Sequence, residues 1–200
     1  MSRELRDRHE QILAVAARLF ARKGVAATTV REIADQVGIL SGSLYHHFDS
    51  KEAMVDQILA PYLRDLRAAC DEALSAPADP AVRLRRLISA SLQVAAAHPH
   101  ATEIYQSDVN YLTQSDRFAY LTSAAADVRK TWLQVIEDGI ASGAFRPDMD
   151  PGIVYRLMRD AIWLSIRWFR PGPACSLANF ADDCTSLFLD GLRCVPPYVG

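Results

Sequence analysis

The chain has 200 residues, half of them hydrophobic and 23% charged, with a formal net charge of −2. This is the composition of a globular protein, and it excludes a largely disordered chain. The charge is unevenly distributed, because residues 1–51 carry 8 basic and 6 acidic side chains whereas the remainder carries 14 and 18. The first quarter is therefore mildly basic although the chain as a whole is acidic.

The sequence favours a soluble protein of the cytoplasm. Its four cysteines form no CxxC pair, and we expect free thiols in a reducing compartment rather than disulfides or zinc ligands. The polar N-terminus lacks the apolar segment of a signal peptide, and no stretch reaches the roughly 18 apolar residues of a membrane span. We expect neither a metal nor a cofactor.

Three helices are predicted within the first 50 residues. Apolar side chains at helical spacing predict the first over about residues 5–22. Thr29 and Glu32 have the spacing of a capping box for a second, short helix, which Gly38 closes. We expect Ser41 to cap a third helix that runs to about residue 47. Two short helices joined by a tight turn are typical of a helix-turn-helix unit.

The rest of the chain is also predicted to be helical. Asp49 and Glu52 have capping-box spacing and are expected to begin a long helix to about Ser75, ended by the proline-containing segment 76–80. Five further helices are predicted at about residues 81–97, 101–113, 117–142, 151–169 and 177–193. No alternating strand pattern occurs. The predicted fold is all-α, with a helix-turn-helix domain at 1–51 and a larger helical bundle at 52–200.

The run from Gly24 to Glu52 closely resembles the DNA-binding domain of the TetR family of bacterial regulators. The matching pieces are Gly24, Thr29, Ile33-Ala34, Gly38, Gly42-Ser43-Leu44-Tyr45, Phe48 and Lys51-Glu52. The close match covers about a quarter of the chain, and the rest matches in length and helix pattern. The resemblance implies a repressor that binds a palindromic operator in double-stranded DNA. Residues 52–200 are then the ligand-sensing and dimerisation domain, through which a small-molecule inducer releases the DNA.

The DNA contacts are expected to come from the starts of three helices. The predicted contact residues are Thr29, Arg31, Ser41, Gly42, Ser43, Tyr45, His46 and Lys51. A recognition helix enters the major groove by its N-terminal end, where short side chains allow a close approach to phosphates and bases. Arg3 and Arg6 are predicted to form a mobile arm that adds affinity for phosphates. The alternative stays open that the Ser and Thr residues only cap helices and that Tyr45 and His46 are plain surface.

The predicted helix at 151–169 places arginines and a tryptophan on one narrow stripe. Its members, at 100° per residue, are Arg156, Arg159, Trp163, Arg167 and, if the helix reaches it, Arg170. Arginine forks bind phosphate or carboxylate, and tryptophan and arginine planes stack on purines. Two interpretations stay open: a solvent or dimer face, and a groove that binds an anionic, partly planar ligand.

With the N-terminal sequence, this stripe resembles the TetR-type repressors of cholesterol catabolism in actinobacteria. That resemblance implies an acyl-CoA thioester from steroid ring degradation as the inducer. Its adenine and phosphates would suit Arg159, Trp163 and Arg167. Candidate walls for the acyl group, which can equally be plain core, are Tyr105, Tyr111, Phe118, Leu121 and Trp132. A regulator of a different catabolic or efflux operon, with a ligand other than a CoA ester, is the alternative.

The last two predicted helices, 151–169 and 177–193, are implied by the resemblance to form the homodimer interface. The apolar stripe of the final helix supplies enough surface for such an interface. The alternative stays open that some of the same residues pack in the core of a single chain. An enzyme is the first rival class, but the sequence shows no nucleophile elbow, metal-ligand spacing or positioned base. An architectural DNA-binding protein without a ligand is the second, and the size of the C-terminal domain argues against it.

Overall fold

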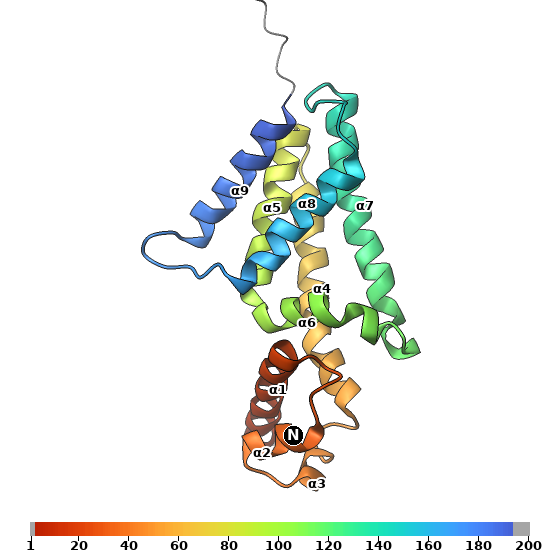
Figure 1. Ribbon diagram of the computed structural model, residues 1–200, viewed down its shortest axis with the longest axis vertical. Helices are drawn as coiled ribbons and strands as arrows, with labels where there is room; N and C mark the ends of the chain where they lie inside the picture. Colours follow the sequence, from red (N-terminus) through yellow and green to blue (C-terminus); the bar gives the residue numbers. More distant parts are fainter. Residues whose placement is uncertain (1–2, 194–200) are drawn as a thin grey trace, which may run out of the picture. The chain divides into compact units, whose positions relative to one another are not determined.

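The structure of the protein is a computed structural model that describes residues 3–193, and this part of the chain is helical almost throughout (Figure 1). Its helices are α1 (Arg3–Lys23), α2 (Val30–Val37), α3 (Ser41–Leu44), α4 (Lys51–Leu74), α5 (Pro80–Ala97), α6 (Pro99–Leu112), η1 (Asp116–Phe118), α7 (Ala119–Ala141), α8 (Pro151–Trp163), η2 (Leu164–Arg167) and α9 (Leu177–Leu192). Within the same residues the only β-type pairings are isolated bridges. The predicted all-α fold is confirmed.

The chain divides into two compact units that are discontinuous in sequence. The first unit runs to Arg64 and includes His98–Thr122, and the second comprises Asp65–Ala97 and the chain from Ser123 onward. Helix α6 therefore belongs with the helix-turn-helix segment, and α4 passes from one unit to the other. The functional division expected between residues 51 and 52 stays a prediction.

In the first unit, α1 packs against both α2 and α6, and α2 packs against α3. The core side chains these helices share are apolar and fully buried; among them are Ile12, Phe20, Ile33, Leu44 and Ile104. Burial of apolar surface is the main force that holds such a small unit together. The amphipathic spacing of α1 and α2 already predicted which of their faces would turn inward.

The predicted caps of α2 are confirmed. Thr29 Oγ1 accepts a hydrogen bond from the Glu32 N–H at 3.2 Å, and the Thr29 N–H donates to Glu32 Oε2 at 3.0 Å. Gly38 ends the helix with φ +74°, the left-handed conformation that glycine adopts without strain.

Two other predicted caps are wrong. The N-cap of α3 is Leu40 rather than Ser41, and its side chain makes no capping bond. Helix α4 begins at Lys51, and Ser50 Oγ accepts from the Ala53 N–H at 3.1 Å, so Ser50 rather than Asp49 caps it. Helix α3 also ends at Leu44, earlier than expected, and continues as a turn.

In the second unit, α5 packs against α8 and α9, and α8 also contacts α9. Helix α8 ends at Trp163 and continues as the 3-10 helix η2, so the single long helix predicted over 151–169 is shorter than expected. Cys70, Cys175 and Cys184 are free thiols, and Cys194 lies outside the described residues. Within residues 3–193, no helix is both long and apolar enough to cross a membrane.

Candidate DNA interface and ligand site

The predicted DNA-contacting side chains of α2 and α3 have exposed surface in the structure. Tyr45 is 55% exposed, His46 and Gly42 are exposed, and Ser41 and Ser43 are half-buried. On α2, Thr29 and Arg31 are exposed, and the Arg31 side chain makes only a long ion pair, 3.9 Å, with Asp35. These side chains are therefore accessible to a DNA duplex. The Thr29 hydroxyl oxygen also caps α2 by accepting the Glu32 N–H bond.

The outward orientation of Tyr45 and His46 follows from buried residues on either side of them. Leu44 is fully buried, and the Phe48 ring stacks on His9 of α1 with centroids 4.2 Å apart. Because Leu44 and Phe48 lie four residues apart and both point inward, the residues between them turn toward solvent.

Lys51 is engaged with the backbone of the turn between α1 and α2. Its Nζ donates to the carbonyl of Val25 at 2.7 Å and to that of Thr28 at 3.1 Å. The Thr28 hydroxyl also donates to the Gly24 carbonyl at 2.8 Å. We name these two Lys51 bonds the Lys51 clamp. The sequence does not indicate this role, because the bonded residues are 26 and 23 positions away. The expected phosphate contact of Lys51 stays a prediction.

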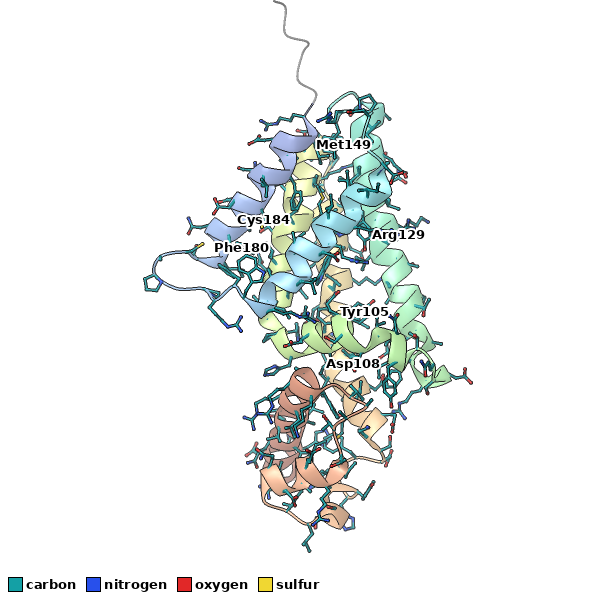
Figure 2. All side chains as sticks on the ribbon, viewed as in Figure 1. Tyr105, Asp108, Arg129, Met149, Phe180 and Cys184 are labelled. Carbon is teal, nitrogen blue, oxygen red and sulfur yellow. The ribbon has the colours of Figure 1, made fainter. Side chains whose placement is uncertain are left out.

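Asp108 of α6 reaches the same turn (Figure 2). Its Oδ1 accepts from the Val25 N–H at 3.2 Å, and it lies 3.3 Å from where a Cβ on Gly24 would stand, where the backbone has φ +84°. Its Oδ2 is buried without a hydrogen-bond partner. Burial raises the pKa of the Asp108 carboxyl, an effect the Val25 bond partly offsets. The sequence does not indicate this contact, because Asp108 and Val25 are 83 positions apart.

The second unit contains a buried aromatic cluster formed by Trp132, Tyr155 and Trp163. The Trp132 ring is completely buried, with centroids 5.8 Å from Trp163 and 6.3 Å from Tyr155. The indole N–H groups of Trp132 and Trp163 are both buried without a hydrogen-bond partner. Buried donors are rarely left unsatisfied in native proteins, because each costs about 1–3 kcal/mol. A ligand acceptor within this cluster would remove that cost.

Two arginines influence the same cluster electrostatically. Burial raises the pKa of the Tyr155 hydroxyl, and the guanidinium groups of Arg159 on α8 and Arg129 on α7 lower it (Figure 2 labels Arg129). Arg159 also donates from Nε to Asp160 at 2.8 Å. Arg129, and Arg159 with its ion-pair partner Asp160, are therefore the charged groups that act on this cluster. Arg129 was missed by sequence analysis, since it lies on a different helix from the arginine stripe.

The structure separates the members of the predicted ligand site. Trp132 and Trp163 are in contact and Arg159 is near them, but Trp163 is only 3% exposed and so does not share an open stripe with the arginines. Arg167 is exposed on η2, past the end of α8. Tyr105 belongs to the first unit, where its hydroxyl donates to the Leu121 carbonyl at 3.5 Å.

Two successive short helices with exposed polar side chains, the first of them capped at both ends, in a chain with a second helical unit, are typical of a helix-turn-helix DNA-binding regulator. The chain belongs to the TetR family. The family model described as "Bacterial regulatory proteins, tetR family" matches residues 12–58, and the model described as "Tetracyclin repressor-like, C-terminal domain" matches residues 77–192.

The chain is similar along nearly its whole length to proteins named HTH-type transcriptional repressor KstR2. It is 43% identical to the one from Rhodococcus jostii, covering 92% of this chain and 91% of the relative, and 41% identical to the one from Mycobacterium tuberculosis, covering 94% of each. A solved structure described as the ketosteroid transcriptional regulator KstR2 of Mycobacterium tuberculosis superposes with a TM-score of 0.86, at 41% identity and coverage of 94% and 96%. These relatives are transcriptional regulators, and the chain is a TetR-type regulator rather than an enzyme. The expected resemblance to this branch of the family is confirmed.

Replacing Lys51 by Met tests the Lys51 clamp. The substitution is expected to lower the free energy of unfolding by about 1.5–3 kcal/mol, because two backbone carbonyls lose a charged donor. Urea unfolding followed by circular dichroism measures this. The matched control is Arg31→Met, at a side chain 85% exposed, which should leave unfolding unchanged. A Lys51→Met protein that unfolds like the wild type would show that the clamp contributes nothing to stability. If, in addition, the slope of log affinity against log salt concentration falls by about one, Lys51 only contacts a phosphate.

Asp108→Asn is expected to stabilise the protein at neutral pH. The Asp108 pKa is raised above its ordinary value of 3.8, so the folded state holds this proton more tightly than the unfolded state. The resulting stabilisation is fully present below that value and is lost as pH rises through the folded-state pKa. An asparagine keeps an oxygen for the Val25 N–H and carries no charge to bury.

The gain in melting temperature of Asp108→Asn should thus be larger at pH 7 than at pH 4. Asp71→Asn, at an exposed position of α4, serves as the control and should show no such difference. An equal shift at both pH values would mean that the charge of Asp108 costs the folded state nothing.

Proposed function

We propose that this chain represses transcription by binding a palindromic operator as a homodimer, and that a small-molecule inducer releases it. The carrying observation is 40–43% identity to KstR2 repressors across more than nine-tenths of the chain. The proposed inducer is an acyl-CoA thioester from steroid ring degradation, since a relative of known structure is described as a ketosteroid regulator. A repressor of bacterial operators works in the cytoplasm, where the DNA is.

Operator contacts are proposed for the eight residues selected from the sequence. They are Thr29, Arg31, Ser41, Gly42, Ser43, Tyr45, His46 and Lys51. Exposure of the α2 and α3 side chains supports this assignment. Arg31 and Lys51, which carry positive charge, would position the protein on phosphates, and the side chains of α3 would read base edges. The Lys51 clamp occupies two of the three donors of its ammonium, which leaves one for a phosphate.

A second copy of the chain is proposed to cover the outer faces of α8, η2 and α9. Large apolar side chains there are more than half exposed: Ile153, Leu157, Trp168 and Leu187. Phe180, near the start of α9 (labelled in Figure 2), stacks on Phe169 with centroids 4.2 Å apart, which joins α9 to the segment that follows η2. Clustered exposed apolar residues mark interaction surfaces, and a twofold dimer matches a palindromic operator.

The inducer is proposed to bind at the aromatic cluster of the second unit. The unsatisfied indole N–H groups of Trp132 and Trp163 offer donors, and Arg129 and Arg159 offer positive charge beside them. A CoA ester carries phosphates and a planar adenine, and arginine and tryptophan are suited to both. Tyr105, which belongs to the first unit, and Arg167 stay ligand residues proposed from the sequence and are not assigned to this cluster.

Helix α6 supplies a physical route from ligand to DNA. Tyr105, a proposed ligand residue, and Asp108, which bonds the Val25 N–H, lie three residues apart on this helix and hence on one face. A ligand that favours a displaced α6 would act on the turn between α1 and α2 through Asp108. A preference of a few kcal/mol for the released state is enough to change operator occupancy strongly.

The ligand proposal is tested by a mobility-shift titration of the protein on its own upstream DNA. Steroid-derived acyl-CoA thioesters are expected to release the DNA, and free CoA is not, because release requires the acyl group. Arg159→Ala and Trp163→Phe should each weaken release at least tenfold while leaving DNA binding intact. The control Arg85→Ala removes an equally exposed arginine that also pairs with an aspartate, and it should respond like the wild type.

If the protein binds specific DNA and no thioester releases it, the proposed DNA-binding regulator stands and the proposed CoA-ester inducer is refuted. A ligand of another chemistry would then have to be sought. Absence of specific binding to any upstream fragment would refute repression of the neighbouring genes.

Leu157→Glu is expected to convert the protein from dimer to monomer at micromolar concentration, because a buried, unpaired carboxylate is costly in an apolar seam. Sedimentation velocity measures the molar mass. Tyr111→Glu, at another exposed hydrophobic position but on α6, is the matched control and should stay dimeric. A Leu157→Glu variant that sediments as a dimer would place the interface elsewhere.

A further inference from the structure

Leu40 occupies a position that its chemistry does not explain. It is 80% exposed, more than any other large hydrophobic side chain among residues 6–193, whose exposure the structure describes. It is also the N-cap of α3, where Ser, Thr, Asp or Asn would stabilise the helix by accepting a backbone N–H bond. Leu40 therefore contributes little to the core and nothing to the cap through its side chain.

The backbone around Leu40 is held in place on both sides. Before it, Gly38 adopts a left-handed conformation, and the Ile39 N–H donates to the Ala34 carbonyl at 3.0 Å. After it, the Ser43 N–H donates to the Leu40 carbonyl at 2.9 Å. The backbone therefore fixes the position of the Leu40 side chain at the N-terminus of α3, the proposed recognition helix.

The residues that directly follow Leu40 leave its side chain uncovered. Ser41, Gly42 and Ser43 have short side chains or none, so the leucine extends beyond them. The major groove presents a single apolar group, the C5-methyl of thymine, and apolar side chains recognise it by contact.

We propose that Leu40 is a specificity-determining residue that contacts a thymine methyl in each half of the operator. The inference rests on the proposed DNA binding and adds an aliphatic base contact to the eight contact residues proposed above. The contact disfavours cytosine and any other base without a methyl group at that place. It also explains why an apolar residue stands where a polar cap would stabilise α3.

Leu40 is less suited to binding a protein, whether a second copy of this chain or another partner. The second unit has four large apolar side chains that are more than half exposed, Ile153, Leu157, Trp168 and Leu187, whereas the residues that follow Leu40 on α3 are small and polar. A docking surface for a protein needs a contiguous apolar patch of several hundred Å².

The test uses the full-length protein and DNA without a methyl group. A binding site is first selected from a pool of random duplexes, and its thymines are then replaced by deoxyuridine one symmetric pair at a time. Loss of one methyl contact should weaken wild-type binding about fourfold per half-site, from about 0.8 kcal/mol for a buried methylene-sized group. The Leu40→Ala protein should bind the thymine and deoxyuridine duplexes equally at that one pair.

Leu187→Ala is the matched control, since it makes the same substitution at a leucine 73% exposed on α9. Any loss of dimerisation there should lower affinity for both duplexes alike and leave their ratio unchanged. Leu40→Ala should also melt like the wild type, because an 80% exposed side chain adds little to stability.

Two results would overturn the inference while leaving the DNA-binding function intact. One is a selected site at which no thymine can be replaced by deoxyuridine with loss of affinity. The other is a Leu40→Ala protein that keeps the full thymine preference, which would assign the methyl contact to another side chain such as Tyr45. Failure to select any sequence would instead overturn the proposed function, and this inference with it.

Discussion

The turn between α1 and α2 is held from two directions, and the geometry of the DNA-binding unit depends on it. A turn that joins two helices leaves backbone N–H and carbonyl groups without helical partners. Here the Lys51 clamp satisfies the carbonyls of Val25 and Thr28, and Asp108 of α6 accepts the Val25 N–H. Lys51 comes from α4 and Asp108 from α6. These two helices therefore both help to fix the turn that sets the angle between α1 and α2.

Several polar groups of this structure are buried without partners, and they mark where function is proposed. Asp108 keeps one carboxylate oxygen unsatisfied beside the turn, and Trp132 and Trp163 keep their indole N–H groups unsatisfied inside the second unit. A fold selected for stability alone would replace such groups with apolar ones or provide partners. Asp108 lies in the unit of the proposed DNA contacts, and the two indoles lie in the unit of the proposed inducer site.

The local part of the structure followed directly from the sequence. The Thr29–Glu32 capping box and the Gly38 C-cap involve residues within four positions of one another, so they are visible in the sequence itself. Ser41 and Asp49 were misplaced as caps by one residue. Spacing alone does not reveal where the chain leaves the extended conformation, and at Leu40 the residue type argued against the cap that the structure shows.

The all-α fold and the helix-turn-helix could be predicted from the amino-acid sequence, because apolar periodicity and caps act over one or two helical turns. The contacts of Lys51, Asp108 and Trp163 could not, because they join residues of different helices. The clamp spans 23 and 26 residues and the Asp108 bond 83. A helical wheel puts Trp163 beside arginines, but it does not show that Trp132 of another helix covers it. Such contacts depend on how helices pack against one another, which the spacing within one helix does not encode.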